Sequence, residues 1–328
     1  MPIVNEPLLA VERLDVAYRV VHEGRHRWLT AVNQVSFQVS RGETLGIIGE
    51  SGSGKTSIAR ALLRLIDIRS GTVRFRGTDL RQQHGARLRA LRRYLQMIFQ
   101  DPLASLDPRM QVAEIVAEPL HVFEPHLPAD ERLRRVSQAL RTVGLSEEHL
   151  YRFPHSFSGG QAQRIAIARA LIVQPELVVC DEPLSALDVS IKSQISNLLK
   201  DLQQRMALSL LFISHDLAAV RFLCDRVLVL YLGRVMELAA TDTLFQTPRH
   251  PYARALLQAA LIPDPLIARS RARMALQGEV PSPLEAPSGC VFRTRCPLAI
   301  ERCRLEVPAL RPLNGSLVAC HRAEESVP

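Results

Sequence analysis

The chain of 328 residues has room for one large α/β domain with an extension, or for two domains. Its composition, with 47% hydrophobic and 23% charged residues, is that of a globular protein, and it contains no uncharged apolar run of about 18 residues that could span a bilayer. The net charge of +8 is compatible with nucleic acid, anionic lipid or nucleotide partners and selects none of them.

The N-terminal residues lack the basic and apolar regions of a signal peptide, so we expect a cytosolic protein. Alternating apolar and polar residues at 9–14 and 32–39 predict two half-buried antiparallel strands separated by a polar loop. Tyr18, at the end of the first strand, can stack on an adenine ring or pack within the sheet. The sequence does not decide between these two roles.

A glycine-rich loop follows an apolar run at 45–48 and precedes a helix predicted at 55–66. The loop has the pattern G-x-x-x-x-G-K-[ST] of a phosphate-binding P-loop, in which backbone N–H groups and a helix N-terminus face the phosphates. We expect Lys55 to reach the β- and γ-phosphates and Thr56 to bind Mg²⁺. The residues predicted to bind the nucleotide here are Gly49, Glu50, Ser51, Gly52, Ser53, Gly54, Lys55 and Thr56.

Three further apolar runs predict buried strands, and polar side chains follow each of them. Gln100 and Asp181 can contact Mg²⁺ or its bound water. Glu182 is placed to orient or deprotonate an attacking water, and His215 is a candidate for the same site. The three runs are residues 94–99, 177–182 and 208–213.

Residues from about 103 to 165 differ in character, because apolar residues at helical spacing alternate with prolines. We interpret them as a helical subdomain inserted into the core. Within it, Ser158-Gly159-Gly160-Gln161 opens a helix, either as a second anion site or as an ordinary N-cap. Asp188 closes a tight loop that starts at Ser185.

Together these motifs resemble the ATP-binding subunits of ABC transporters over about residues 8–245. The only departure noted is Phe157, where the general signature has Leu, and we expect it to cost no phosphate contact. The resemblance implies an α/β P-loop NTPase core at residues 1–245, with an antiparallel β subdomain, that hydrolyses ATP to ADP and phosphate. In the order of the family, the motifs are Walker A (Gly49–Thr56), the Q-loop (Gln100), the signature (Ser158–Gln161), the end of Walker B (Asp181–Glu182), the D-loop (Ser185–Asp188) and the switch histidine (His215).

Segments at 98–110, 185–190, 249–256 and 288–297 resemble importers of dipeptides and oligopeptides. Within that branch, the chain is most similar to the second ATPase of a heterodimeric pair. This resemblance implies a homologous second ATP-binding subunit, two membrane permease subunits and, indirectly, a periplasmic peptide-binding protein. The two ATPases would dimerise head to tail at the cytoplasmic face of the inner membrane. Ser158, Gly159 and Gly160 would then bind the γ-phosphate of the ATP held by the partner, and Gln161 and Asp188 are predicted as further nucleotide-binding residues.

Residues 246–328 are interpreted as a C-terminal extension, whose part at 246–289 is a connecting segment with a short helix. Four of the six cysteines lie beyond that segment, with gaps of five, six and sixteen residues that do not match the paired C-x2-C of zinc ribbons. Thiolates suit zinc or an iron–sulfur cluster, and free thiols or disulfides are the further alternatives. The resemblance implies a [4Fe–4S] cluster, with zinc as the alternative, at Cys290, Cys296, Cys303 and Cys320.

Two other functions compete with peptide import. The first is import of another small solute, such as nickel, because a transporter ATPase does not touch its cargo. The second is an ABC ATPase of nucleic-acid maintenance, which usually carries a long insert or two tandem cores. The stretch between Gln100 and Ser158 is too short for such an insert and the chain has one Walker A motif, so we expect no nucleic-acid partner.

Overall fold

The computed structural model describes residues 6–260 and 279–325. The chain divides into two compact units, each assembled from separate stretches of sequence. The N-terminal segment and the predicted connecting segment at 246–289 lie partly outside the described residues. The first unit comprises residues 1–8, 39–44 and 79–223, and the second comprises residues 9–38, 45–78 and 224–328.

The centre of the first unit is formed by three parallel strands in the order β8-β7-β6. Leu177 of β7 lies opposite Leu95 on one side and Ser209 on the other. All residues of β7 and β8 are buried, which explains why these strands are nearly continuous apolar runs. Because the strands are parallel, their carboxyl ends share one edge of the sheet. The three predicted strands are confirmed as β6 (Leu95–Ile98), β7 (Leu177–Asp181) and β8 (Ser209–Ile213).

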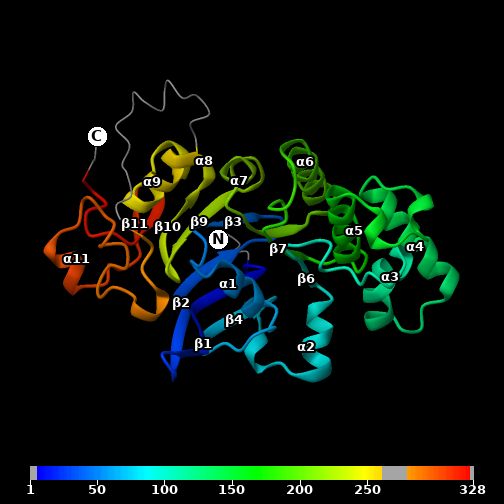
Figure 1. Cartoon of the computed structure of the whole chain (residues 1–328), viewed down its shortest axis with the longest axis horizontal. Coiled ribbons are helices and arrows are strands. Elements are labelled where there is room, and N and C mark those ends of the chain that lie inside the picture. Colours follow the sequence, from blue (N-terminus) through cyan, green and yellow to red (C-terminus); the bar gives the residue numbers. More distant parts are fainter. Residues whose placement is uncertain (1–5, 261–278, 326–328) are drawn as a thin grey trace, which may run out of the picture. The chain divides into compact units, whose positions relative to one another are not determined.

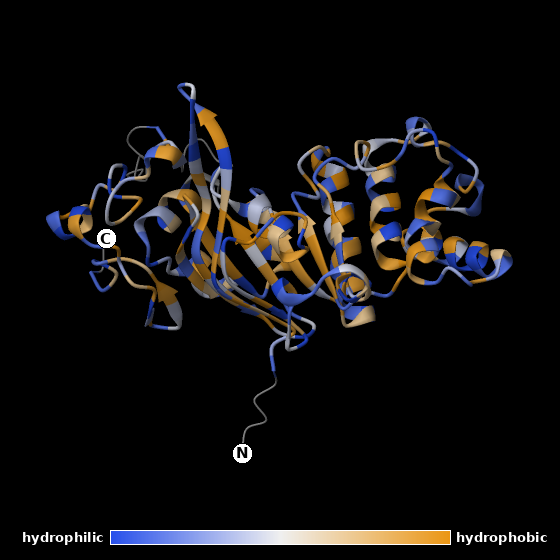
Figure 2. Ribbon diagram, turned by 90° about the horizontal axis from the view of Figure 1, so that it is seen from below, coloured by the Kyte–Doolittle hydropathy of each residue, from blue (hydrophilic) through white to orange (hydrophobic). Residues whose placement is uncertain are grey.

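The inserted segment is helical, as predicted, and α3, α4 and α5 pack against one another (Figure 1). Helix α3 begins with a capping box in which the Glu114 carboxylate accepts a hydrogen bond from the backbone N–H of Gln111 at 3.0 Å. Helix α4 buries Val136 and Leu140, and Figure 2 shows hydrophobic residues gathered on one face of these helices. The helices of this unit are α2 (Gly85–Arg92), α3 (Val112–Phe123), α4 (Ala129–Thr142), α5 (Gly159–Leu171), α6 (Val189–Met206) and α7 (Leu217–Leu223).

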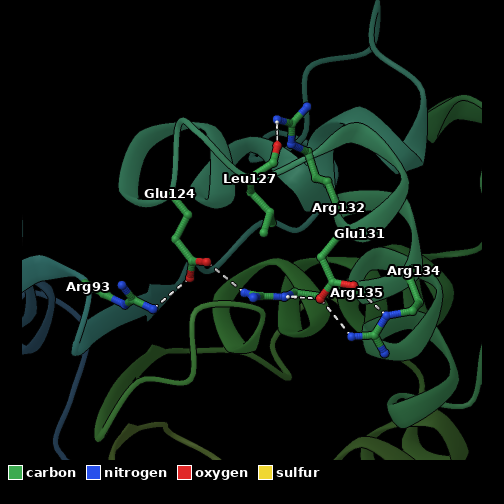
Figure 3. Close-up of polar contacts among 7 residues, drawn as sticks. All are labelled: Arg93, Glu124, Leu127, Glu131, Arg132, Arg134 and Arg135. Carbon is green, nitrogen blue, oxygen red and sulfur yellow. Dashed lines mark hydrogen bonds and ion pairs between the residues drawn. The ribbon is translucent and has the colours of Figure 1, made fainter.

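A network of ion pairs joins α4 to the ends of α2 and α3 (Figure 3). Glu124 accepts hydrogen bonds from Arg93 at 2.7 Å and from Arg135 at 2.9 Å. Glu131 accepts hydrogen bonds from Arg134 at 2.7 Å and from Arg135 at 3.0 Å, and these bonds lower the pKa of Glu131 to about 2. The Glu131 carboxylate therefore stays ionised at neutral pH, and Arg135 bridges both acids.

The second unit contains a four-stranded antiparallel sheet in the order β2-β1-β4-β5. The polar loop expected between the first two strands is wrong, because both strands continue to a two-residue turn at Glu23 and Gly24, whose φ angles are 51° and 73°. Val21 and Trp28 are exposed near this turn, so the alternation that marks a half-buried strand is lost there. The strands are β1 (Leu9–His22), β2 (Arg25–Val39), β4 (Ser70–Phe75) and β5 (Thr78–Asp79).

The other strands of this unit lie side by side in the order β11-β12-β10-β9-β3, as part of a larger sheet. β3 and β9 are parallel, and the other pairs are antiparallel. β11 and β12 come from the C-terminal extension, and Leu317 of β12 lies opposite Leu238 of β10. The extension therefore adds two strands to this sheet. The bounds are β3 (Thr44–Ile48), β9 (Arg226–Tyr231), β10 (Arg234–Ala240), β11 (Arg311–Leu313) and β12 (Ser316–Val318).

Short helices complete the second unit. The helix predicted after the glycine-rich loop is α1, and the short helix predicted in the connecting segment is α9. Within the described residues, no helix is both long and apolar enough to cross a membrane. The helices are α1 (Lys55–Leu62), α8 (Thr241–Gln246), α9 (Pro251–Ala260) and α11 (Glu301–Leu305).

Candidate functional site

The glycine-rich loop joins β3 to α1, and its backbone requires glycine at two positions. Gly54 has φ 105°, and a Cβ atom there would lie 2.2 Å from the carbonyl oxygen of Ala31. A Cβ atom on Gly49 would lie 2.2 Å from the carbonyl oxygen of Leu230. Both clashes are with backbone, which cannot move aside as a flexible side chain can. The loop is thus held closely against neighbouring strands, as a P-loop pattern requires.

Lys55 folds back over this loop. Its Nζ donates hydrogen bonds to the carbonyl oxygens of Gly49 at 2.8 Å and Glu50 at 3.0 Å, and the residue is only 5% exposed. An ammonium group and the N-terminus of α1 therefore meet at the same loop. Two sources of positive potential at one place favour an anion such as a phosphate group.

Tyr18 lies close to the start of α1. Its hydroxyl donates a hydrogen bond to the Ser57 hydroxyl at 3.0 Å, and the residue is half-buried. The ring is therefore neither fully packed in the sheet nor fully exposed. Both roles considered for Tyr18 are compatible with this position, and stacking on an adenine ring stays a prediction.

Three predicted site residues meet at the carboxyl edge of the parallel strands in the first unit, around one carboxylate oxygen of Glu182. Glu182 Oε2 accepts a hydrogen bond from Gln100 Nε2 at 3.2 Å and lies 3.4 Å from His215 Nδ1. Asp181, at the end of β7, is 3% exposed. A carboxylate flanked by an amide and an imidazole can orient a water molecule and accept its proton.

The backbone of Glu182 is in the left-handed region, with φ 47°. Its N–H donates to the carbonyl oxygen of Ile213 at 2.9 Å, and its own carbonyl accepts a hydrogen bond from the Ser185 hydroxyl at 3.0 Å. A left-handed conformation is costly for a residue other than glycine and is found most often at functional sites. These bonds hold the carboxylate at the strand tip.

The Ser-Gly-Gly segment forms the start of α5. The Ser158 hydroxyl accepts a hydrogen bond from the Gln161 N–H at 3.3 Å, and the Gln161 side chain accepts one from the Ser158 N–H at 3.1 Å. This capping box confirms the structural role of Ser158. Gly160 is needed for packing, because a Cβ atom there would lie 2.6 Å from Ile191 Cγ2 of α6. Asp188 is exposed at the N-cap position of α6, and its side chain makes no capping bond.

The predicted magnesium ligands are divided between the two units, since Thr56 belongs to the second and Gln100 and Asp181 belong to the first. Within residues 6–260 and 279–325, no group of three or more His, Cys, Asp and Glu side chains is arranged to hold a metal ion. The magnesium site therefore stays a prediction.

The four C-terminal cysteines lie in one neighbourhood, where the thiols influence each other's ionisation. Burial raises the pKa of Cys290 to about 12 and that of Cys296 to about 11, and it also raises the pKa of Cys320. Backbone N–H groups two residues further along act in the opposite direction at all three, and that of Arg322 lies 3.4 Å from Cys320 Sγ. The backbone N–H of Cys290 donates to the carbonyl oxygen of Cys303 at 2.8 Å.

Two neighbours of the loop could not be foreseen from the sequence. Tyr252 and Arg295 both contact Glu50, although about 200 residues or more separate them from it in the chain. In the sequence, Tyr252 and Arg295 stand out only because both lie in segments that resemble peptide importers. That resemblance does not indicate that either residue contacts Glu50.

The sequence matches the family described as ABC transporter at residues 32–185, and the family described as oligopeptide/dipeptide transporter, C-terminal region, at residues 236–303. The oligopeptide transport ATP-binding protein OppF of Haemophilus influenzae is 48% identical over 322 residues, which cover 96% of this chain and 97% of that protein. OppF of Escherichia coli is 47% identical over 97% of this chain and 96% of its own length. A putative peptide import ATP-binding protein of Brucella ovis is 51% identical over 96% of this chain and 98% of its own length.

Solved structures agree with these relatives. The dimeric post-hydrolysis state of the ATP-binding cassette MJ0796, bound to ADP and Pi, matches with a TM-score of 0.65 and 28% identity, over 71% of this chain and 98% of that one. The cbiO1 protein of Clostridium perfringens matches with a TM-score of 0.64 and 28% identity, over 74% of this chain and 92% of its own. The predicted α/β fold class is thereby confirmed. This chain belongs to the ATP-hydrolysing proteins of the ABC transporter family, in the group that carries the oligopeptide/dipeptide transporter C-terminal region.

Proposed function

We propose that this chain hydrolyses MgATP to power the import of dipeptides or oligopeptides through a membrane ABC transporter. The observation that carries the proposal is the contact of one Glu182 carboxylate oxygen with both Gln100 and His215. These contacts suit the activation of water, because the carboxylate accepts a proton while the amide and the imidazole fix the orientation of the carboxylate. The names of the relatives in Haemophilus, Escherichia and Brucella support peptide import.

In this proposal the loop from Gly49 to Thr56 binds the phosphates of ATP, and Lys55 moves from the loop carbonyls to the phosphate oxygens. Thr56, Gln100 and Asp181 hold Mg²⁺, directly or through water, and oxygen donors of this kind suit that ion. Bound Mg²⁺ would neutralise charge on the phosphates. Glu182 and His215 position the attacking water, and Tyr18 stacks on the adenine ring.

The proposal also includes partners. A homologous ATP-binding subunit would dock head to tail, so that Ser158, Gly159, Gly160, Gln161 and Asp188 of this chain complete the site for the ATP bound by the partner. The exposure of Ser158 and Asp188 supports this role. Two permease subunits would receive the motion of the ATPases at the cytoplasmic face of the membrane, and a periplasmic peptide-binding protein would deliver the cargo.

Uptake by cells tests the cargo. Cells that lack this chain are expected to lose uptake of labelled dipeptides and oligopeptides, and the wild-type chain should restore it because ATP hydrolysis supplies the driving force. Uptake of radioactive nickel in the same strains is the matched comparison. Peptide uptake that is normal in the deletion strain, together with a loss of nickel uptake, would make a metal the cargo.

We further propose that Cys290, Cys296, Cys303 and Cys320 bind a [4Fe–4S] cluster, with zinc as the alternative occupant. Four thiols and the N–H groups directed toward three of them fit such a group chemically. The described thiols are not arranged as a metal-binding group, so the side chains must turn toward a common centre when the cluster binds. The cluster would hold the extension together without taking part in ATP hydrolysis.

Metal analysis decides between the occupants. Protein purified without oxygen is expected to contain about four iron atoms and about four sulfide ions per chain, and little zinc. Replacing Cys303 by Ser should abolish iron binding, whereas Cys224→Ser, at a buried cysteine outside the set, should leave it unchanged. Stoichiometric zinc without iron would rule out the cluster.

A further inference from the structure

The glycine-rich loop has a support that the established activity does not explain. Glu50, the second residue of the loop, donates its backbone N–H to the Tyr252 hydroxyl at 2.9 Å. Its two carboxylate oxygens accept hydrogen bonds from Arg295 Nη1 at 3.1 and 2.8 Å. Tyr252 lies on α9 and Arg295 lies between two of the C-terminal cysteines. The extension therefore holds one residue of the loop by both its backbone and its side chain.

The two supporting side chains are themselves firmly held. Arg295 is 8% exposed, and its guanidinium lies 5.9 Å from the ring centroid of Tyr231. The rings of Tyr231, Tyr252 and Phe292 are buried, and their centroids are 4.7 to 5.3 Å apart. Aromatic packing at these distances is favourable and leaves little freedom of rotation. The contacts of Glu50 thus come from a rigid cluster of side chains.

Glu50 also connects this cluster to Lys55. Its backbone carbonyl accepts a hydrogen bond from Lys55 Nζ at 3.0 Å, on the same residue whose N–H is bound by Tyr252. A shift of Tyr252 or Arg295 would therefore move the backbone on which the ammonium group rests. A misplacement of about 1 Å in a group that must contact the reacting part of a substrate can cost about 10²-fold in rate.

Charge gives Arg295 a second effect. The side chain of Glu50 is 23% exposed and would, if unpaired, place a negative charge in a loop that binds phosphate. Arg295 neutralises that charge. Removing Arg295 would leave the Glu50 carboxylate, which is largely shielded from water, without its cation, and such an uncompensated charge is costly.

We propose that Arg295 and Tyr252 are positioning residues for ATP binding, acting through Glu50. The inference rests on the proposed role of the loop as the phosphate-binding site. It assigns part of the C-terminal extension to the nucleotide site: the extension sets the conformation and the charge of the loop.

Steady-state ATP hydrolysis by the assembled transporter tests this role. Arg295→Met is expected to raise the KM for ATP roughly tenfold with little change in kcat, because the partly exposed Glu50 carboxylate is left without its cation beside the phosphates. Arg295→Lys should keep most of the wild-type affinity for ATP that Arg295→Met loses. The double variant with Glu50→Gln should bind ATP better than Arg295→Met alone, since the repelling charge is gone. Tyr252→Phe should give a smaller rise in KM.

Arg302→Met is the matched control, because Arg302 forms an exposed ion pair with Glu306 in the same extension. It should leave KM unchanged. If Arg295→Met behaves like this control, or if Glu50→Gln does not improve its KM, Arg295 only stabilises the extension and the inference is overturned. Lys55→Ala separates this inference from the proposed phosphate-binding role of the loop. If Lys55→Ala binds ATP weakly but Arg295→Met has a normal KM, only the inference about Arg295 is overturned. If Lys55→Ala binds ATP normally, both the role of the loop and the inference are overturned.

Discussion

Replacing Glu182 by Gln is expected to reduce kcat for ATP hydrolysis by about 10²–10⁴-fold while ATP still binds. The glutamine amide has nearly the shape of the carboxylate and can keep contacts to Gln100 and His215, which lie 3.2 and 3.4 Å from Glu182 Oε2. It cannot accept a proton from water. The variant should therefore accumulate as an ATP-bound closed dimer, detected as a stable complex by size-exclusion chromatography in the presence of MgATP.

The control for this variant is Glu285→Gln, which removes an exposed carboxylate outside the predicted site and should hydrolyse ATP at the normal rate. Normal hydrolysis by an assembled transporter that carries Glu182→Gln would show that another group activates the water. Such a result would leave the family assignment intact and would remove the proposed role of Glu182.

Replacing Lys55 by Ala is expected to weaken ATP binding by about 100-fold or more. Each hydrogen bond from a charged donor contributes about 1.5–3 kcal/mol, and about 1.4 kcal/mol corresponds to a tenfold change in affinity. Lys55 Nζ also donates hydrogen bonds to two loop carbonyls, at 2.8 and 3.0 Å, so its removal takes away a support of the loop. The dissociation constant measured by isothermal titration calorimetry checks this prediction.

Lys200→Ala on α6 is the matched control for charge, because it removes the same ammonium group from a helix outside the predicted phosphate site. Its affinity for ATP should equal that of the wild type. If Lys55→Ala and Lys200→Ala lose ATP affinity equally, the overall charge of the protein attracts the nucleotide. The predicted contact of Lys55 with phosphate would then be unsupported.

The core strands could be predicted because nearly all of their residues are buried. The runs that became β6, β7 and β8 are mostly apolar, and this signal can be recognised without any knowledge of the neighbouring strands. The far ends of β1 and β2 gave no such signal, since their side chains are exposed around the turn at Glu23 and Gly24. There the strands are held together by their backbone hydrogen bonds, and such bonds leave no alternation of apolar and polar residues in the sequence.

The candidate site was predictable in its residues and less so in its contacts. Motif order identified Gln100, Glu182 and His215, and parallel strands bring their positions to one edge. The left-handed backbone of Glu182 is imposed by tertiary bonds and could not be read from an ordinary acidic residue. Similarly, the contacts of Glu50 with Tyr252 and Arg295 depend on the path of the chain between them, which local patterns do not describe.

The pairing of β12 with β10 affects how the chain can be shortened. Leu317 and Val318 lie opposite Leu238 and Glu237, so the last strand pair covers backbone groups of β10 that would otherwise be unpaired. A truncation that removes residues 311–318 would leave those donors and acceptors open to strands of other molecules. The expected outcome is self-association through the uncovered strand, because the intact sheet ends instead on β11, a three-residue edge strand that contains Pro312 and is poorly suited to pairing with another copy.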